Sequence, residues 1–336
     1  MKNNNILILG SNEKFSLESM YIKAFKKLNY KVRIFHTYNI SKDLKSRFIW
    51  KFLRFFIFES VRKKILNFIK NNKQKYDLII IFKGLYLDEP FFSKLRNISN
   101  SKKIINIFPD DPFDVNYFKD ISNKNILKCI PYFDHVFIYS KFLLKKLKKH
   151  YPKSRFSYLP FGYDSLIKKK KNKNNKKKFD LSFIGTADRE RYNIIKQLSG
   201  FKIILAGNGW HKYDLSNNIT LKDIITPDNF SKLYKKSNFS LNILRKQNKK
   251  SHNMKTFEIP ANDGVMITYK NIEQNNFFPE NKASIMYRDI NDLKSKIDYF
   301  SRNLKKVNKI RENSKIIFKN HSYLERTKYL LKIIYE

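Results

Sequence analysis

The chain alternates strand-like runs with amphipathic helical stretches, and this alternation occurs twice along its 336 residues. In the first half the strand-like runs occupy residues 6–9, 32–35, 78–82, 104–108, 136–139 and 156–159. In the second half they occupy residues 181–184, 202–206, 239–243 and 265–268, with a short extended run at 219–221. Strands that are apolar throughout are typical of sheets buried on both faces, and their alternation with helices predicts parallel, doubly wound sheets. The expected fold class is therefore α/β.

A lysine-rich segment separates the two halves. Residues 168–178 read KKKKNKNNKKK and contain no apolar side chain, so mutual repulsion favours a solvated linker. Hydrophobic residues make up 42% of the chain, which is enough for two cores. We therefore expect a first domain over residues 1–166, a linker over 167–179 and a second domain over 180–320.

The charge of the chain points to anionic partners. Lys and Arg number 70 against 29 Asp and Glu, which gives a formal net charge of +41. Nucleic acid, acidic lipid and phosphorylated substrates all suit such a surface, although a Lys- and Asn-rich composition also reflects an AT-rich genome. A nucleic-acid-binding protein is one alternative, but the lysines are spread over nearly every predicted element and no known nucleic-acid motif appears. No specific nucleic acid is therefore expected.

Targeting signals are weak. The chain has one cysteine, Cys129, so neither an internal disulfide nor a Cys-rich zinc site can form. The apolar run after MKNNN is too short for a signal peptide, and no stretch approaches the roughly 18 apolar residues that span a bilayer. A cytoplasmic protein is expected.

One aromatic and basic segment suggests a membrane surface. Residues 47–58 read RFIWKFLRFFIF, and Arg62, Lys63 and Lys64 follow. A basic amphipathic helix of this kind can lie in an anionic bilayer interface, which predicts peripheral attachment to the inner face of the cell membrane. The alternative is a core helix of the first domain.

The segment over residues 251–268, SHNMKTFEIPANDGVMIT, is the most informative about chemistry. Ser251 or Asn253 can cap a helix, and a helix N-terminus attracts phosphate. Lys255 and Glu258 are three residues apart and share a helix face. A cation and a carboxylate there suit a phosphate and a sugar hydroxyl, whereas the alternative is an ordinary surface ion pair.

This segment resembles the signature of CgeB-like glycosyltransferases, which are relatives of the group-1 GT-B family. Their pattern is roughly N-x-R-x-F-E-I/A-x-A-C-G-G followed by an apolar strand, and the matching residues are Asn253, Phe257, Glu258, Ala261 and Gly264. Further similar elements are LSFIGT at 181–186 with Arg189 and Arg191 after it, SLNI at 240–243, PDDP at 109–112 and LPFGYD at 159–164. Taken together, the resemblance of these elements covers most of the chain.

The resemblance implies a GT-B fold, in which two Rossmann-like domains face a cleft and a C-terminal helix, residues 321–336, crosses back to the first domain. The second domain would hold a nucleotide-sugar donor, and the first would present a glycan or lipid-linked acceptor. The implied donor-binding residues are Gly185, Thr186, Arg189, Arg191, Arg245, His252, Asn253, Glu258 and Gly264. Arg189 and Lys255 would offset the charge of the leaving diphosphate, and Glu258 would bind the ribose.

Asp110 and Asp111 complete the expected catalytic set with Lys255. They follow a buried strand and can orient an acceptor hydroxyl or act as its base; the alternative is a turn cap before Pro112. The two carboxylates are adjacent and lack the spacing of an Asp-x-Asp metal clamp, so no metal is expected. Without a G-x-G-x-x-G fingerprint no nicotinamide cofactor is expected either, and the nucleotide sugar serves as substrate. His211 and His252 are expected at the surface, with His252 nearer the ligand.

The sequence also departs from the family pattern. Lys255 replaces the usual Arg, which keeps the charge and loses the bidentate fork. Asn262 and Asp263 replace a small Cys-Gly pair and add a carboxylate near the expected phosphate site. Lys250 stands where the group-1 pattern has a second Glu, so retaining stereochemistry is not implied. An inactive, glycosyltransferase-like binding protein is a further alternative.

Overall fold

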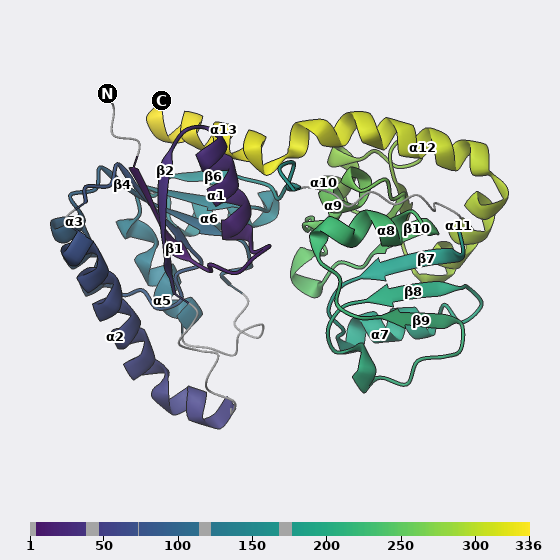
Figure 1. The fold of residues 1–336 in the computed structure, drawn as a ribbon, viewed down its shortest axis with the longest axis horizontal. Helices are drawn as coiled ribbons and strands as arrows, with labels where there is room; N and C mark the ends of the chain where they lie inside the picture. The colour runs from purple at the N-terminus through teal and green to yellow at the C-terminus, as the bar shows by residue number, and fades with distance from the viewer. Residues whose placement is uncertain (1–4, 38–46, 73, 114–121, 168–176) are drawn as a thin grey trace. The chain divides into compact units, whose positions relative to one another are not determined.

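The structure is a computed structural model that describes residues 5–37, 47–72, 74–113, 122–167 and 177–336. The chain forms two compact units, Met1–Pro160 with Thr327–Glu336, and Phe161–Arg326 (Figure 1). The predicted linker lies largely outside the described residues, because 168–176 are not among them.

A six-stranded parallel sheet in the order β2-β1-β3-β4-β5-β6 forms the centre of the first unit. Its strands are β1 (Asn5–Gly10), β2 (Lys31–His36), β3 (Leu78–Phe82), β4 (Lys103–Phe108), β5 (His135–Ile138) and β6 (Phe156–Tyr158). The helices of this unit are α1 (Leu17–Lys27), α2 (Arg47–Asn72), α3 (Glu89–Ser99), α5 (Ser122–Cys129), α6 (Lys141–His150) and the end of α13 (Tyr323–Tyr335). All five residues of β3 are fully buried, as expected of a central strand covered on both faces.

The second unit repeats this arrangement with the strand order β12-β11-β10-β7-β8-β9. Its strands are β7 (Phe179–Ile184), β8 (Ile203–Ala206), β9 (Ile219–Lys222), β10 (Ser237–Asn242), β11 (Met266–Tyr269) and β12 (Ile285–Tyr287). Its helices are α7 (Arg189–Lys196), α8 (Phe230–Tyr234), α9 (Lys255–Ala261), α10 (Ile272–Phe277), α11 (Ile290–Arg302) and α12 (Leu304–Ile317). The strand order reverses between β7 and β10, which is where open α/β sheets bind ligands at their carboxyl edge.

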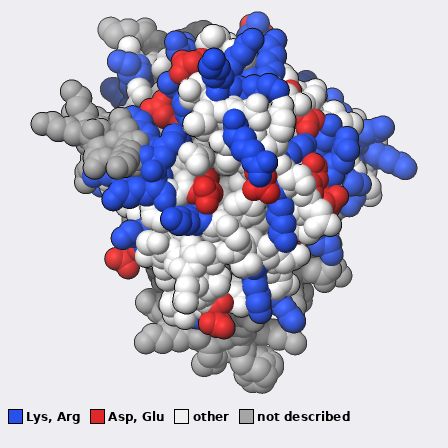
Figure 2. All heavy atoms as spheres, turned by 90° about the vertical axis from the view of Figure 1, so that its right-hand side faces the viewer, with Lys and Arg blue, Asp and Glu red and all other residues white. Residues whose placement is uncertain are grey.

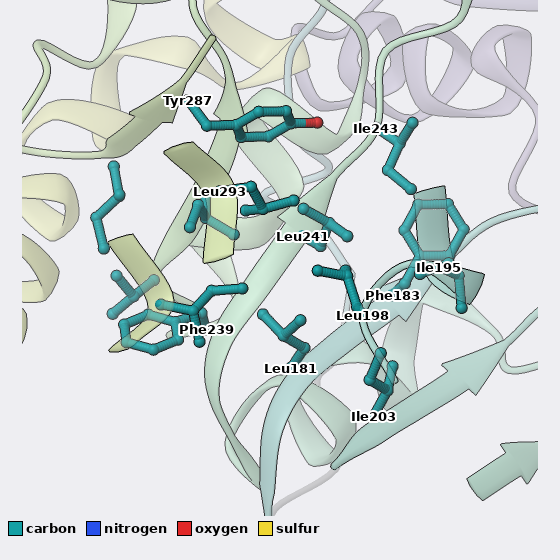
Figure 3. Packing of buried hydrophobic residues seen from close by; sticks show 14 of the residues in the cluster. Leu181, Phe183, Ile195, Leu198, Ile203, Phe239, Leu241, Ile243, Tyr287 and Leu293 are labelled. Atoms are coloured by element: carbon teal, nitrogen blue, oxygen red, sulfur yellow. The ribbon is translucent and has the colours of Figure 1, made fainter. Parts of the chain in front are cut away.

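Alternate residues of the central strands build the core of the second unit. Leu181 of β7 and Leu241 of β10 point to the same side of the sheet, where Ile195 of α7 and Leu293 of α11 cover them (Figure 3). The two parallel, doubly wound sheets expected from the sequence are thus confirmed.

Side chains in different parts of helix α2 differ in their exposure to solvent. Val61, Ile65 and Ile69 are buried in the first unit, so this half of α2 is a core helix. Phe55 and Phe56 are 65% and 66% exposed, which is unusual for large aromatic side chains. Within the described ranges, no helix is both long enough and apolar enough to span a bilayer.

Basic side chains are widely distributed over the surface. On the face shown in Figure 2, Lys and Arg occur between neutral and acidic side chains and do not gather into one stripe. The lone Cys129 is buried in the first unit.

Candidate functional site

Arg191 ties together the carboxyl ends of two neighbouring strands. Its guanidinium donates to the Thr186 carbonyl after β7 at 2.8 Å and to the Ile243 carbonyl after β10 at 3.5 Å. The Phe183 ring lies 5.5 Å from the guanidinium carbon, and only 12% of the Arg191 side chain is exposed. Arg191 thus fixes the geometry of the strand ends at the point where the strand order reverses.

Asp188 interacts with arginines at the carboxyl edge of the second sheet. Its Oδ1 accepts from the Arg191 amide at 2.9 Å, which caps α7. Its Oδ2 lies 3.6 Å from Nε of both Arg191 and Arg245. Arg189 is exposed at the first position of α7, and about a third of the Arg245 side chain is exposed. Two predicted donor-binding arginines, Arg191 and Arg245, therefore lie beside one carboxylate, and Arg189, the next residue in the chain, is exposed.

The glycines at this edge serve close backbone packing. A Cβ on Gly207 would lie 2.2 Å from the Gly185 carbonyl oxygen, and Gly207 has a φ of +138° that other residues rarely adopt. The Gly185 carbonyl also accepts from Trp210 Nε1 at 2.8 Å. Gly207 thus allows the turn after β8 to approach Gly185 closely, and Thr186 beside Gly185 is exposed.

Asn253 fixes the start of α9 to the end of β10. Its side-chain oxygen accepts from the Thr256 amide at 3.1 Å, and its amide nitrogen donates to Asn242 Oδ1 at 2.8 Å. Of the two predicted helix caps, Asn253 therefore makes the capping bond, whereas the Ser251 hydroxyl lies 3.3 Å from His252 Nδ1.

Lys255 and Glu258 form a partly buried pair on α9. Lys255 Nζ lies 2.7 Å from Glu258 Oε2 and 3.8 Å from the centre of the Phe230 ring. The two side chains are only 22% and 11% exposed, so an ordinary surface ion pair is the wrong interpretation. Within the described chain Glu258 Oε1 has no partner, which leaves it able to accept from a ligand.

A second polar group lies unpaired near this carboxylate. The Tyr234 hydroxyl is buried and has no hydrogen-bond partner among the described residues. Burial and the charge of Glu258 raise the Tyr234 pKa, so the hydroxyl stays protonated and can donate. Asn262 Oδ1, on the next turn of α9 from Glu258, is likewise buried without a partner in the described structure. Buried polar groups without partners are uncommon and are often completed by a ligand or water.

His252 is placed differently from the prediction. It is fully buried rather than at the surface; its Nδ1 lies 3.0 Å from Glu273 Oε1, and its Nε2 accepts from the Phe161 amide at 3.1 Å. Burial lowers the pKa of His252, so the ring is neutral with its proton on Nδ1. His211 is exposed, as expected.

Two further residues of the signature pack within the second unit. A Cβ on Gly264 would lie 2.7 Å from Ile259 Cγ2 and 2.8 Å from Ser240 Oγ, so this glycine allows α9 to approach the sheet. Asp263 pairs with Lys235 at 3.1 Å and with Lys315 at 3.6 Å. Asp263 follows the C-terminal end of α9, whereas Lys255 begins this helix, so the two residues lie at opposite ends of α9.

The two candidate carboxylates of the first unit follow β4. Asp110 Oδ2 lies 2.8 Å from Lys83 Nζ, and Asp111 Oδ1 accepts from the Phe113 amide at 2.8 Å. Asp111 thus makes the turn-capping bond considered as its alternative. The catalytic role of either carboxylate stays a prediction.

Sequence reasoning missed Asp188, Phe230 and Tyr234. Asp188 stands three residues before Arg191, the spacing of an N-cap, and this signal was available. The contacts of Phe230 and Tyr234 depend on the packing of α8 against α9, which no local pattern predicts.

Known proteins resemble this chain in sequence over part of its length and in fold over nearly all of it. Residues 189–332 match the family model described as glycosyl transferase-like, which is less than half of the chain. The matched range contains eight of the predicted site residues, namely Arg189, Arg191, Arg245, His252, Asn253, Lys255, Glu258 and Gly264. A search of curated protein sequences found no match.

Solved structures resemble the whole chain. HepE of Anabaena, in complex with UDP-glucose, superposes with a TM-score of 0.66 at 10% identity and covers 98% of this chain and 99% of its own. The chain has the GT-B glycosyltransferase fold. T4 phage BGT in complex with its UDP-glucose substrate gives a TM-score of 0.60 at 16% identity, with 98% and 99% covered.

A third structure matches over a smaller share. TarM of S. aureus, in complex with fondaparinux, alpha-GlcNAc-glycerol and UDP, gives a TM-score of 0.59 at 12% identity. The match covers 81% of this chain, which spans 58% of the TarM chain. At such low sequence identity, the similarity to these structures shows the fold alone. It does not distinguish the CgeB-like group from other GT-B proteins.

Proposed function

We propose that this protein transfers a sugar from a nucleoside diphosphate donor to an acceptor and that the second unit holds the donor. The observation that carries the proposal is the Lys255–Glu258 pair on α9, which is held in place yet retains unused hydrogen-bonding capacity. A fixed cation and a fixed carboxylate one helical turn apart suit the two polar parts of a nucleotide, the diphosphate and the ribose.

The cations at the carboxyl edge of the second sheet would bind the diphosphate. Lys255 uses one of its three N–H groups for Glu258 and has two left for a phosphate oxygen. Arg189 and Arg245 are exposed enough to reach a ligand, whereas Arg191 would act by holding the strand ends. Negative charge grows on the diphosphate as the sugar–phosphate bond breaks, so cations placed there stabilise the transition state most.

Glu258 would bind the ribose. Its free Oε1 is an ionised acceptor, and ionised acceptors form hydrogen bonds roughly twice as strong as neutral ones. The buried Tyr234 hydroxyl, which has no partner among the described residues, would add a donor close by. Asn253 would position this group by fixing the start of α9.

UDP-glucose is the first donor to test. It is the ligand of the HepE and T4 phage BGT structures that resemble the whole chain. Arg189, Arg245 and Lys255 at this edge of the second unit would offset the charge of the leaving group without a metal ion. The reaction would need no further cofactor.

The first unit would present the acceptor. A glycan or a lipid-linked precursor is proposed, with Asp110 or Asp111 orienting its hydroxyl. Exposed Phe55 and Phe56 on α2, with basic residues on the same helix, support peripheral attachment to an anionic membrane on its cytoplasmic face.

A thermal-shift screen against nucleoside diphosphates and their sugars tests the proposal. A ligand that binds only the folded protein raises its stability by about 2.7 kcal/mol at a concentration of 100 times Kd. We expect UDP and one UDP-sugar to raise the melting temperature. If no nucleotide does so at millimolar concentration, while the protein melts cooperatively, donor binding is refuted.

A further inference from the structure

A basic pocket lies at the amino edge of the first sheet, where β4, β5 and β6 begin. Its volume is about 410 Å³, within the usual range for small-molecule sites. Four cations line it: Lys102 and Lys103 at the start of β4, and Lys153 and Arg155 before β6. The end of α13, with Ile333 and Ile334, forms another wall.

Protein carboxylates do not neutralise this pocket. Its one acidic lining residue, Asp134, accepts through Oδ2 from Arg96 at 3.1 Å and from the Ile104 amide at 2.6 Å. Its charge is therefore already shared with a cation outside the pocket. Lys153 and Arg155 are exposed and make no ion pair within the described part of the chain.

The other two cations of the pocket, Lys102 and Lys103, make only weak or partial interactions with the protein. Lys102 lies 3.7 Å from Asp77 but is 78% exposed, which makes that pair weak. Lys103 donates to the Ile334 carbonyl near the end of α13, which leaves two of its N–H groups available. A concave surface lined by one sign of charge concentrates its field and attracts an opposite charge.

Apolar side chains form part of the same pocket. Phe133 and Ile334 are buried beneath its polar rim, and Pro131 and Ile333 line its side. A ligand that carries a charged phosphate and a short carbon skeleton would contact both kinds of surface. Inorganic phosphate alone would use only the rim.

The pocket is separate from the predicted catalytic carboxylates of the same unit. Lys103 begins β4 and Asp110 follows its other end, so the two sites are about 20 Å apart along the strand. A molecule in the pocket would not occupy the position expected for the acceptor hydroxyl.

From this geometry we propose a second ligand site, at the amino edge of the first sheet, that binds a phosphate ester. The phosphate would lie between Arg155, Lys153 and Lys103, with its carbon skeleton against Phe133 and Ile334. The ester belongs either to a free phosphorylated metabolite or to the headgroup of a phospholipid.

His135 offers a direct readout. Its ring lines the pocket, and its Nε2 lies 3.0 Å from Ser157 Oγ. Burial, together with the charges of Arg155, Lys103 and Lys148, lowers the His135 pKa to about 4. An anion in the pocket would offset those charges and raise the His135 pKa, which NMR of the histidine ring measures.

The test uses the full chain and two double variants. Lys153→Ala/Arg155→Ala removes two pocket cations, and Lys145→Ala/Lys149→Ala removes two exposed cations of α6 outside the pocket. Glycerol 3-phosphate is the soluble probe. Vesicles of phosphatidylglycerol with phosphatidylcholine, against phosphatidylcholine alone, test the headgroup.

We expect the pocket variant to weaken binding of the effective probe about ten- to a hundredfold and the α6 variant to leave it nearly unchanged. Binding of glycerol 3-phosphate with a raised His135 pKa identifies a free ester. Pocket-dependent binding to anionic vesicles alone identifies a headgroup. Equal weakening by both variants, or an unchanged His135 pKa with every probe, would overturn the proposal.

Discussion

Replacing Glu258 by Ala should weaken nucleotide binding while the protein stays folded. In the structure Glu258 Oε2 is bonded to Lys255 and Oε1 has no partner among the described residues, so a ribose hydroxyl can bond to Oε1 without breaking the existing pair. Net hydrogen bonds to charged groups contribute about 1.5–3 kcal/mol. Losing one predicts a roughly ten- to hundredfold increase in the dissociation constant.

The same substitution has a structural consequence. Lys255 loses its carboxylate partner but keeps the Phe230 ring at 3.8 Å and some solvent exposure. The loss of stability should therefore be about 1–2 kcal/mol, below the 3–5 kcal/mol typical of breaking a fully buried pair. Glu258→Gln is the matched control, because it keeps the shape and one acceptor oxygen and removes the charge. Its affinity should fall between those of the wild type and Glu258→Ala.

Isothermal titration calorimetry with the nucleotide found by screening measures these effects, and thermal unfolding verifies the fold. Lys255→Ala should differ from Glu258→Ala by slowing turnover more than it weakens donor binding, because its charge matters most as the diphosphate leaves. Wild-type affinity in a folded Glu258→Ala variant would mean that the ribose binds elsewhere and would refute this placement.

Three further predictions follow from the packing and the charges. Phe55→Ser/Phe56→Ser should reduce sedimentation with anionic liposomes at low salt and leave the melting temperature nearly unchanged, because both rings are exposed; equal sedimentation would argue against α2 as the anchor. Gly207→Ala should destabilise the protein by about 2–5 kcal/mol, because its Cβ would meet a carbonyl oxygen, whereas Gly200→Ala, with nothing within 4 Å, should have little effect in the same denaturant titration. Burial and the nearby Arg326 guanidinium lower the folded-state pKa of His321 to about 4, so its contribution to stability is complete above its ordinary pKa of 6.5 and is lost as pH falls towards 4. The variant His321→Asn should therefore show a smaller loss of unfolding free energy between pH 7 and 4.5, and an unchanged loss would exclude this titration.

The regular elements could be predicted from the sequence because they depend on local patterns. The apolar run at 78–82 became β3 with the predicted bounds, and the aromatic and basic segment at 47–58, which was expected to be helical, became part of α2. Three short elements, α3, α10 and β12, were not predicted. Strand β12 has only three residues, Ile285–Tyr287, and is too short to show a periodic pattern.

The site was less predictable because its contacts join distant residues. The partners that bury His252 are distant in the sequence: Phe161 stands 91 residues before it and Glu273 stands 21 residues after it. The residues next to His252 in the sequence therefore gave no indication that its side chain is buried. The Lys255–Glu258 contact was predictable from helical spacing, but its shielding by Phe230 was not. The position of Asp263 at the far end of α9 follows from helix geometry once the helix bounds are known.

A crystal structure of the protein with the nucleoside diphosphate identified by screening tests the central claim most directly. We expect the ribose hydroxyls to bind Glu258 and the diphosphate to lie beside Lys255 and the exposed arginines of the second unit. A nucleotide bound only at the amino edge of the first sheet, or one that contacts neither Glu258 nor Lys255, would contradict it.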